Sequence, residues 1–574
     1  MIILGIHSGH DSSASIIKDG IILADVQEER FNRVKHSNNI PLKSIDYCLK
    51  TAGLNSINDV DYISYSWKTN PLPINAIFGL EIKYNTKELI AKSIARTFFG
   101  ISFGMGSHKL PIYYPDYTLT EKEKYINNDH HLSHAASAYY TRKSNDECLV
   151  FTLDGAGDNI STAVWLAQGN EIKLLQKYFK DASIGWAYSI VTEGLHWIHG
   201  DGEGKTMGLA PYGDFTKCKG VLDFLFPMFD DTKLIKKSQY EHGYIWAESG
   251  STQFHFEEAK IVEKLIKKYG KENIAAEAQR LLEQTTMNFV FGWAKKMKIK
   301  KIACAGGIFL NVKLNQHIWN SRDNIIDEQH IYPNPGDSGL AVGAALLEYY
   351  RHNKFEGYDL NNLYYGPEYS NEEIETILKI RKLNYKYISN PSKKAAEFLS
   401  KNKIVAWFQG RMESGPRALG NRSILMSPLK PENKDIINAW VKFREGFRPF
   451  CPSLLWEKRN DYLTDCRDEF FMITSFDVLP EKRDHIPAVV HVDGTVRPQM
   501  VKKEINPKYW ELINEFGKIT GEYIILNTSF NVMGEPIINN PKEAIKCFFD
   551  TGLDAIFIGN YFLEKDSNHK KSDI

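Results

Sequence analysis

The amino-acid sequence predicts an α/β protein with at least two domains, in which the N-terminal part is duplicated and the C-terminal part is a separate α+β unit. Three observations support this prediction. The chain has 574 residues, well beyond the length at which a single hydrophobic core stops growing. A pattern of three short strands occurs twice before residue 176. A polar, turn-rich stretch at residues 351–373 separates halves that carry different motifs.

The first copy of the strand pattern begins at the N-terminus. Apolar runs predict strands at residues 2–6, 14–17 and 21–26, joined by a Gly/His/Asp/Ser loop and then by a tight turn at residues 18–20. The second copy predicts strands at 149–153, 161–167 and 171–175, with a loop at 154–158 and a turn at 168–170. Two copies of one unit indicate a duplicated fold.

Loops of this composition have a chemical use. Turns rich in Gly and Ser can direct successive backbone N–H groups toward a phosphate at close range. Two such hairpins that face each other resemble the superfamily of sugar kinases, actin and heat-shock ATPases. The resemblance implies a two-lobed, ribonuclease-H-like N-terminal domain. The alternative is that both hairpins are plain meander turns without a ligand.

The middle of the chain predicts a long helix and a second candidate ligand corner. Apolar residues recur at helical spacing over residues 274–293, and a strand is expected at 301–305. The strand ends in Gly306-Gly307, with Asn311 on the helix that follows. A Gly-Gly corner allows adenosine to approach the backbone, and it equally allows close packing of helix and strand. Asp337 precedes a helix at 339–350, at the position of an N-cap.

Three histidines fall within five positions in the segment NNDHHLSHAASAYY. His130 and His134 are four residues apart, so on a helix they share one face and both can reach one cation. The pair of His131 and His134 is also compatible with such a face. Two histidines leave a divalent metal short of ligands, so carboxylates must come from elsewhere. The alternative is that water and backbone groups satisfy these histidines, and the spacing alone does not choose.

Three aspartates are candidates to complete such a site. They lie in the second hairpin and before the helix at 339–350, and they are Asp154, Asp158 and Asp337. Two histidines with one or two aspartates suit Fe(II), manganese or zinc.

Composition and charge exclude several classes of function. Lys+Arg and Asp+Glu both number 71, so no global attraction to nucleic acid or an acidic membrane is expected. The seven cysteines stand singly, which argues against a disulfide framework and a C-x-x-C zinc site. The apolar stretches are too short for a signal-peptide core or a membrane span. We therefore expect a soluble cytoplasmic protein without a nucleic-acid or membrane partner.

An ordered set of motifs runs from residue 1 to the C-terminal end. The N-terminal part carries GIHSGHDSSASI, EERFNRVKH, DHHLSHAASA, LDGAGD, EGKTMGLAPYG, GGIFLN and NPGDSG, and the C-terminal part carries GRMESGPRALGNRS, VKFREGFRPFCPS, HVDGTVRPQ and LNTSFNVMGEP. Together they resemble the O-carbamoyltransferase family, which includes nodulation protein U and the aminoglycoside, cephalosporin and novobiocin-type carbamoyltransferases.

This resemblance implies two domains and a two-step reaction. Residues 1–355 would form the two-lobed domain and residues 365–574 a YrdC-like domain. The YrdC-like domain would make carbamoyl-adenylate from carbamoyl phosphate and from ATP supplied with Mg²⁺. The N-terminal domain would transfer the carbamoyl group to a hydroxyl of a small-molecule or sugar acceptor. Fe(II) or another divalent metal would be held by His130, His134, Asp154 and Asp337, with His131 as a neighbour only. A homodimer is an open expectation.

The transfer reaction needs a base and positive charge, and the N-terminal half offers candidates for both. An alcohol is a poor nucleophile, and His10 in the first hairpin loop is the candidate base because imidazole titrates near neutral pH. Lys35 and Lys205 are candidates to hold a phosphate or the carbamoyl oxygen, Lys205 in a Gly-rich turn that lacks the P-loop spacing. The alternatives are a histidine that only shapes its loop and lysines that are solvated.

The C-terminal half is rich in arginine where its motifs are. Guanidinium groups bind phosphate oxygens in a bidentate manner, and two phosphate-bearing substrates need several cations at short range. We expect most of Arg411, Arg417, Arg422, Lys442, Arg444 and Arg448 to lie in the site. The residues expected to bind the nucleotide or the carbamate are Arg417, Lys442, Arg448, Arg497, Asn527 and Ser529, the last two following a strand at 523–526.

Three other functions compete with this interpretation. A threonylcarbamoyl-transfer enzyme acting on tRNA conflicts with the neutral charge and the long second domain. An ATP-dependent maturation protein of the hydrogenase type would carry C-x-x-C zinc fingers, which the sequence lacks. A sugar kinase would leave the arginine-rich half unexplained.

Overall fold

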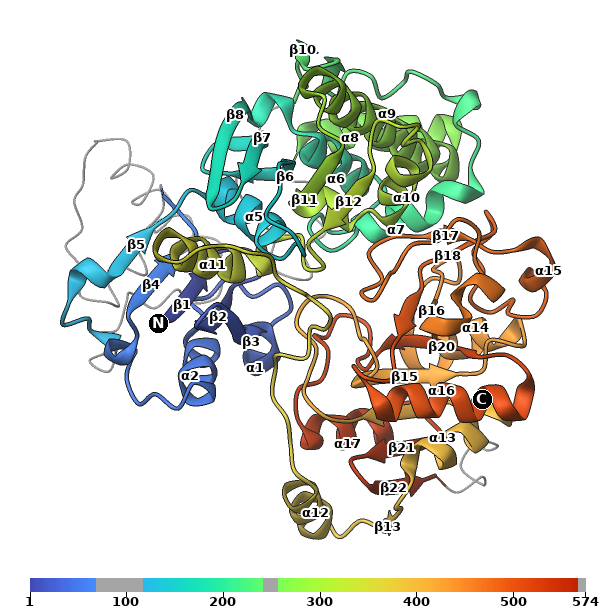
Figure 1. The fold of residues 1–574 in the computed structure, drawn as a ribbon. Coiled ribbons are helices and arrows are strands. Elements are labelled where there is room, and N and C mark those ends of the chain that lie inside the picture. Colours follow the sequence, from blue (N-terminus) through green and yellow to red (C-terminus); the bar gives the residue numbers. More distant parts are fainter. Residues whose placement is uncertain (69–116, 241–255, 566–574) are drawn as a thin grey trace.

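The computed structural model describes residues 1–68, 117–240 and 256–565. Two five-stranded sheets form two N-terminal lobes, and a third, larger sheet follows toward the C-terminus (Figure 1). Within the described residues, no helix is both long and apolar enough to cross a membrane.

The two N-terminal sheets have the same topology. The first runs in the order β3-β2-β1-β4-β5 and the second in the order β8-β7-β6-β11-β12. In each sheet, the first three strands form an antiparallel meander. The fourth strand pairs in parallel with the first strand, and the fifth strand pairs in parallel with the fourth. The predicted duplication is therefore confirmed. The strands are β1 (Ile2–His7), β2 (Ser13–Lys18), β3 (Ile21–Gln27), β4 (Tyr62–Tyr65) and β5 (Tyr125–Asn127), then β6 (Cys148–Gly157), β7 (Ile160–Gln168), β8 (Glu171–Phe179), β11 (Lys301–Ala305) and β12 (Glu328–Ile331).

Helices pack around both sheets and complete the two lobes. In the first lobe these are α1 (Glu29–Asn32) and α2 (Leu42–Thr51). In the second they are α6 (Ile184–Gly194), α7 (Glu203–Leu209), α8 (Glu257–Tyr269), α9 (Lys271–Met297) and α10 (Val312–Asn320), with the small hairpin of β9 (Met228–Asp230) and β10 (Lys233–Lys236).

Some predicted element limits were wrong. The loop expected at 154–158 is narrower because β6 continues to Gly157, with an irregular register between Leu153 and Gly157. Lys205 lies in helix α7 instead of a turn. Of the two uses that the sequence left open for Asp337, the cap is not seen, because the N-cap of the following helix is Gly339 and Asp337 lies in a short 3-10 turn before it.

Two helices that pack against each other lie between the lobes, one against β1 and the other against β6. These are α5 (His130–Tyr139) and α11 (Leu340–His352), which lie between the two sheets in Figure 1. Two glycines permit the close approach of α11. A Cβ at Gly5 of β1 would lie 1.9 Å from the carbonyl oxygen of Ala341, and a Cβ at Gly343 would lie 1.9 Å from that of Ser133. The start of α5 is thus held at a fixed depth between the lobes.

The C-terminal part contains an eight-stranded mixed sheet flanked by helices, as an α+β unit. Its strand order is β13-β22-β21-β14-β15-β20-β16-β19. These strands are β13 (Lys386–Tyr387), β14 (Val405–Phe408), β15 (Arg422–Met426), β16 (Cys451–Leu455), β19 (Gln499–Val501), β20 (Ile524–Ser529), β21 (Ala555–Ile558) and β22 (Tyr561–Glu564). The remaining elements are α12 (Asn371–Ile380), α13 (Pro391–Ser400), α14 (Glu432–Ile437), α15 (Pro480–Arg483), α16 (Pro507–Thr520) and α17 (Pro541–Asp550), with the short pair β17 (Phe476–Asp477) and β18 (Thr495–Val496).

A segment without helix or strand, residues 353–370, joins α11 to α12. It lies inside the stretch in which the sequence places the domain boundary. The division at residues 355–365 stays a prediction.

Arginine side chains tie the C-terminal part to the first lobe. Arg30 donates to the carbonyl of Gly415 at 2.8 Å, and Arg33 donates to the carbonyls of Pro536 and Ile537, both at 2.8 Å. In the other direction, Arg411 donates to the carbonyl of Leu23 at 2.8 Å. The motif EERFNRVKH therefore has a structural function at this interface.

One buried carboxyl group lies at the same interface. Asp25 of β3 accepts a hydrogen bond from the Ser414 hydroxyl, and its Oδ1 has no hydrogen-bond partner among the described residues. Burial raises the pKa of Asp25 to about 7, although the bond from Ser414 lowers it. In the unfolded chain an aspartate has a pKa of about 4. The penalty for ionising Asp25 is therefore absent below pH 4 and complete above pH 7, on the order of 4 kcal/mol.

We expect Asp25→Asn to stabilise the protein in a pH-dependent way, because asparagine still accepts from Ser414 and carries no charge to bury. The gain in melting temperature over the native chain should be larger at pH 8 than at pH 5. The matched control is Asp550→Asn, which changes a half-exposed carboxylate and should leave the difference near zero at both pH values. An equal gain at pH 5 and pH 8 would contradict a raised pKa for Asp25.

Candidate functional site

Two histidines and two aspartates from different elements converge between the lobes. His130 and His134 come from the first two turns of α5, Asp154 from β6, and Asp337 from the turn before α11. Their donor atoms all lie within 4.8 Å of one another. These are the four residues that the sequence predicts as metal ligands.

The geometry of this cluster suits a divalent metal ion. The four distances between a histidine Nε2 and an aspartate oxygen are 3.5, 3.7, 3.6 and 3.5 Å. Donors bound at about 2.1 Å around a tetrahedral centre lie about 3.4 Å apart. The Nδ1 atoms of both histidines and Nε2 of His134 are buried, and none has a hydrogen-bond partner among the described residues. Imidazole and carboxylate donors fit Fe(II), manganese and zinc alike.

The charges in the cluster influence each other strongly. Burial raises the pKa of Asp337 well above its usual range, and the neighbouring carboxylate of Asp154 raises it further. Burial acts in the same direction on Asp154, but the two histidines hold its pKa well below the usual value. A cation at the centre would offset the repulsion between the two carboxylates and would thereby lower the pKa of Asp337.

Local structure fixes the orientation of each donor. The Asp129 side chain caps α5 by accepting from the backbone N–H of Leu132, and Asp158 accepts from the N–H of His130 at 3.0 Å. Gly157 leaves room for the His130 ring, because a Cβ there would lie 2.0 Å from its Cδ2. Asp158 thus supports the helix end, and the structure does not place it among the four donors.

The neighbouring residues have separate partners. His131 is buried and bonds to the hydroxyl of Thr152 and the carbonyl of Ile160, both at 2.9 Å. Gly307 donates its N–H to Asp154 at 3.1 Å. Gly306 serves packing, because a Cβ there would lie 2.1 Å from the carbonyl oxygen of Leu153. Of the two glycines only Gly307 lines the cavity described next.

A cavity of about 530 Å³ extends from this cluster to the C-terminal sheet. Asp154 and Asp337 open onto it, while His130 and His134 lie behind them. It is lined by these further residues that the sequence predicts for the site: His10, Lys35, Lys205, Gly307, Asn311, Arg417, Lys442, Arg448, Arg497, Asn527 and Ser529. One cavity therefore reaches both predicted half-sites.

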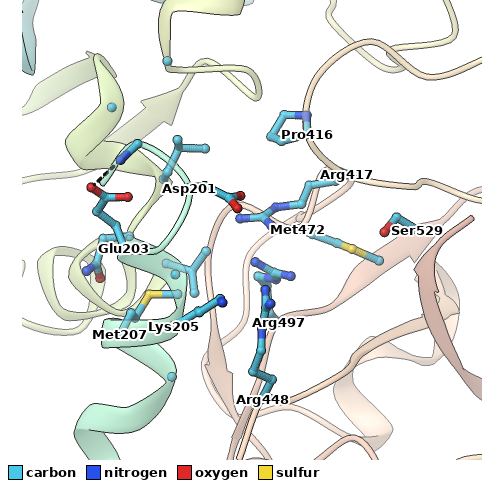
Figure 2. Close-up of a pocket in the computed structure, with 18 of the residues that line it drawn as sticks. Asp201, Glu203, Lys205, Met207, Pro416, Arg417, Arg448, Met472, Arg497 and Ser529 are labelled. Atoms are coloured by element: carbon cyan, nitrogen blue, oxygen red, sulfur yellow. Dashed lines mark hydrogen bonds between the residues drawn. The ribbon is translucent and has the colours of Figure 1, made fainter. Parts of the chain in front are cut away.

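Cations gather on the C-terminal wall of the cavity. Figure 2 shows Arg417, Arg448 and Arg497 directed into the cavity, opposite Asp201, Glu203 and Lys205 of the second lobe.

Burial and neighbouring positive charges lower the pKa values of arginines in this wall. Burial lowers the pKa of Arg417 and of Arg444 to about 9 each, and neighbouring arginines lower both further. Buried nitrogens of both side chains, Nε of Arg417 and Nη2 of Arg444, have no hydrogen-bond partner among the described residues. Such a wall is suited to bind an anion with several oxygens.

Lys442 holds the end of strand β20 in place. Its ammonium group donates to the carbonyl of Ser529 at 2.6 Å, and to the carbonyl and side-chain oxygens of Asn531 at 2.9 and 2.7 Å. Burial, and next the charge of Arg444, lower its pKa well below the usual value.

One detail of the C-terminal half was predicted wrongly. Asn527 and Ser529 lie within β20 and do not follow it, because the strand extends to Ser529. Arg411 and Arg422 bond to backbone carbonyl groups of other segments, so they brace the fold. The other four cations of the two arginine-rich segments line the cavity.

The sequence missed several charged residues of the N-terminal wall, of which four matter below. Asp11, His36, Asp201 and Glu203 all line the cavity. Asp11 and His36 directly follow His10 and Lys35, which the sequence predicts for the site. Their position next to these residues was the one indication in the sequence that they belong to it. Asp201 and Glu203 flank a turn whose course the sequence does not specify.

Comparisons with known proteins identify relatives of both halves. A family profile described as carbamoyltransferase N-terminus matches residues 2–346, and one described as carbamoyltransferase C-terminus matches residues 396–565. Nodulation protein NolNO of Sinorhizobium fredii is 35% identical over 97% of this chain and 79% of its own length. An uncharacterized protein of Methanocaldococcus jannaschii is 35% identical over 94% and 95%, and nodulation protein U of Sinorhizobium fredii is 27% identical over 95% and 96%.

Two solved structures show a distant likeness to this chain. HypF of T. kodakarensis aligns with a TM-score of 0.30 and 12% identity, covering 61% of this chain and 47% of that one. A ROK hexokinase from Thermus thermophilus aligns with a TM-score of 0.27 and 12% identity, covering 60% and 98%.

We expect a divalent metal to stabilise the native chain and to leave His134→Ala unchanged, because the alanine removes one of four donors. At a free Fe(II) concentration of a hundred times Kd, the stabilisation should be about 2.7 kcal/mol. Thermal melts of metal-free protein with added Fe(II), Mn²⁺ or Zn²⁺ measure it. The control is His317→Ala, whose imidazole is part-exposed and paired with Glu283, and which should keep the full shift. Equal shifts in both variants would place the metal elsewhere.

Proposed function

The chain belongs to the carbamoyltransferase family, and from that membership we propose that it is an ATP-dependent O-carbamoyltransferase with two linked reaction sites. The enzyme class follows from the family, whose profiles match both halves of the chain. The two-step chemistry is the proposal. The observation that carries it is the single cavity in which the His/Asp cluster and the arginine wall both take part.

The first step makes carbamoyl-adenylate at the C-terminal wall. Carbamoyl phosphate and water give carbamate and phosphate, and carbamate attacks the α-phosphate of ATP with loss of pyrophosphate. Both substrates are polyanions, and Arg417, Arg444, Arg448 and Arg497 supply guanidinium groups for their oxygens. Lys442 fixes β20, so that Asn527 and Ser529 face the same space. Mg²⁺ would accompany ATP as in other nucleotide reactions.

The second step transfers the carbamoyl group to a hydroxyl oxygen. The hydroxyl gives its proton to His10, a new O–C bond forms, and the bond from the carbamoyl carbon to the adenylate oxygen breaks with its electron pair leaving on AMP. His130, His134, Asp154 and Asp337 would hold the divalent cation. When bound, it offsets negative charge on the departing phosphate. Lys35 and Lys205 add positive charge to the N-terminal wall, although each is paired, with Asp201 and with Glu445 respectively.

One continuous cavity between the two walls suits an unstable intermediate. Carbamate and carbamoyl-adenylate both hydrolyse readily, and a shared cavity allows transfer without release to solvent. Lys205 and Glu445 are 3.0 Å apart and join the second lobe to the C-terminal part beside this cavity. The acceptor we propose is a hydroxyl of a sugar or another small natural product. The overall products are the carbamate ester, AMP, pyrophosphate and phosphate.

We expect variants of the two walls to separate the two steps. Arg448→Met should lower carbamoyl phosphate-dependent exchange of labelled pyrophosphate into ATP about 10- to 100-fold, the effect of losing a charged hydrogen bond. His134→Ala should keep this exchange and lose carbamoyl transfer, measured by mass spectrometry as the gain of one carbamoyl group on a panel of sugars.

The control is Arg459→Met, which removes a guanidinium group stacked on Trp456 in the same half of the chain, and both activities should persist. If carbamoyl phosphate-dependent turnover released ADP and no AMP, the adenylate route would be wrong. If His134→Ala lost pyrophosphate exchange as well, the separation into two sites would be wrong.

A further inference from the structure

Three ionisable side chains form a compact group on the N-terminal wall of the cavity. The imidazole rings of His10 and His36 are stacked, with centroids 5.0 Å apart and planes inclined by 14°. Asp11 lies between them. Its Oδ1 is 2.8 Å from Nδ1 of His36, and its Oδ2 is 3.5 Å from Nε2 of His10. One carboxylate therefore serves both rings.

A second carboxylate binds the far side of His36. Asp201 lies 3.3 Å from Nε2 of His36 and also accepts from Lys35 at 2.5 Å. Both ring nitrogens of His36 thus face carboxylate oxygens, an arrangement that requires two N–H donors and hence the imidazolium form. Although burial alone would lower it, Asp11 and Asp201 hold the pKa of His36 well above its ordinary value.

The surroundings of His10 lower the pKa of its ring, in contrast to those of His36. Burial lowers the pKa of His10, and so does the charge of His36, whereas the facing carboxylates of Asp11, Glu203 and Asp154 raise it, and the net shift is downward. His10 is therefore the neutral ring of the stacked pair near pH 7, and His36 is the charged one.

The two residues of the closest contact in this group, Asp11 and His36, both have a left-handed backbone conformation. Asp11 has φ +59° and His36 has φ +54°, both in the left-handed region that side-chain-bearing residues rarely adopt. Tertiary bonds maintain them: the N–H of Ser12 donates to the carbonyl of Ser37 at 2.9 Å, and the N–H of His36 donates to Glu29 at 2.8 Å. Strain of this kind persists where the surroundings enforce a functional geometry.

We propose that Asp11 and His36 form a positioning pair for His10, in which the fixed charge of His36 keeps His10 neutral and so able to accept the proton of the acceptor hydroxyl. This inference rests on the proposed function, in which His10 is the base. Once His10 has taken the proton, its new positive charge faces Asp11 at 3.5 Å. The carboxylate, until then shared mainly with His36, stabilises that product form.

The same three residues could instead be read as a second metal site, since their donor atoms lie within 4.8 Å of one another. The geometry favours the charge pair. The distance of 2.8 Å between Asp11 and His36 is that of a direct hydrogen bond. Both nitrogens of His36 are used by carboxylates, whereas the histidines of the metal cluster have buried nitrogens without a partner.

The test is the pH profile of kcat/KM for carbamoyl transfer in His36→Asn. Asparagine tolerates the left-handed backbone and carries no charge. Without the charge of His36, the carboxylate of Asp11 acts on His10 alone, so the pKa of the base rises. We expect the acid limb to move up by about 1 pH unit, which lowers kcat/KM by up to about tenfold well below the limb, by a smaller factor at pH 6, and leaves it nearly unchanged at pH 9.

The double variant Asp11→Asn with His36→Asn supplies the decisive comparison. Removing the carboxylate as well should return the acid limb toward the native position, so the second substitution rescues the first. A double variant that is slower than His36→Asn at every pH, or a His36→Asn variant whose loss is equal at pH 6 and pH 9, overturns the proposal. Two bound metal ions per native chain, falling to one in His36→Asn, overturn it as well.

Two further measurements keep this outcome separate from that of the proposed function. Carbamoyl phosphate-dependent pyrophosphate exchange should be unchanged in both variants, because the pair acts only on the second step. His10→Ala should lose transfer at every pH. If His10→Ala retained native transfer, the base assignment itself would fail, whatever the His36 profile. The control for loss of an imidazole is His485→Asn, a part-exposed ring paired with Glu522, whose acid limb should stay at the native position.

Discussion

Four charged or polar donors meet at one buried point between two duplicated lobes, and the surrounding structure depends on this convergence. Burying two carboxylates beside two imidazoles costs several kcal/mol unless a counter-charge is present. The four donors come from three different elements, which together hold them at this point. Helix α5 supplies both histidines, and β6 and the turn before α11 each supply one aspartate. The glycines at positions 5, 157 and 343 allow the close packing that keeps these elements in register.

The division of labour follows from the position of this point. It lies at one end of a cavity whose other end is a wall of arginines from loops of the C-terminal part. Positive charge at one end suits the polyanionic substrates of an activation step, and the N-terminal end supplies ligands for a cation and a base. Arg30, Arg33 and Arg411 hold the two parts together by bonds to backbone carbonyls. The interface therefore fixes the length of the path that an unstable intermediate has to travel.

The sequence was sufficient for the fold of the N-terminal part and for much of the site. Apolar runs separated by Gly-containing turns predict the two meanders, and helical spacing predicts that His130 and His134 share one face. The sequence could not show that Asp337 turns away from the helix it precedes, because capping and coordination use the same residue type at the same place. Nor could it separate Arg417 from Arg422, which lie in one motif. Arg417 reaches the cavity, whereas Arg422 is used by backbone carbonyls. The charge pair of Asp11 and His36 depends on tertiary contact between two loops, which local pattern does not encode.

The central claim is that one divalent ion occupies the point where the four side chains meet. Anomalous diffraction at the absorption edge of the bound metal, from crystals of the holoprotein with ATP, tests it most directly. The account predicts one peak within bonding distance of His130, His134, Asp154 and Asp337, which disappears in His134→Ala. A peak at any other position, or a peak that persists in His134→Ala, would contradict it.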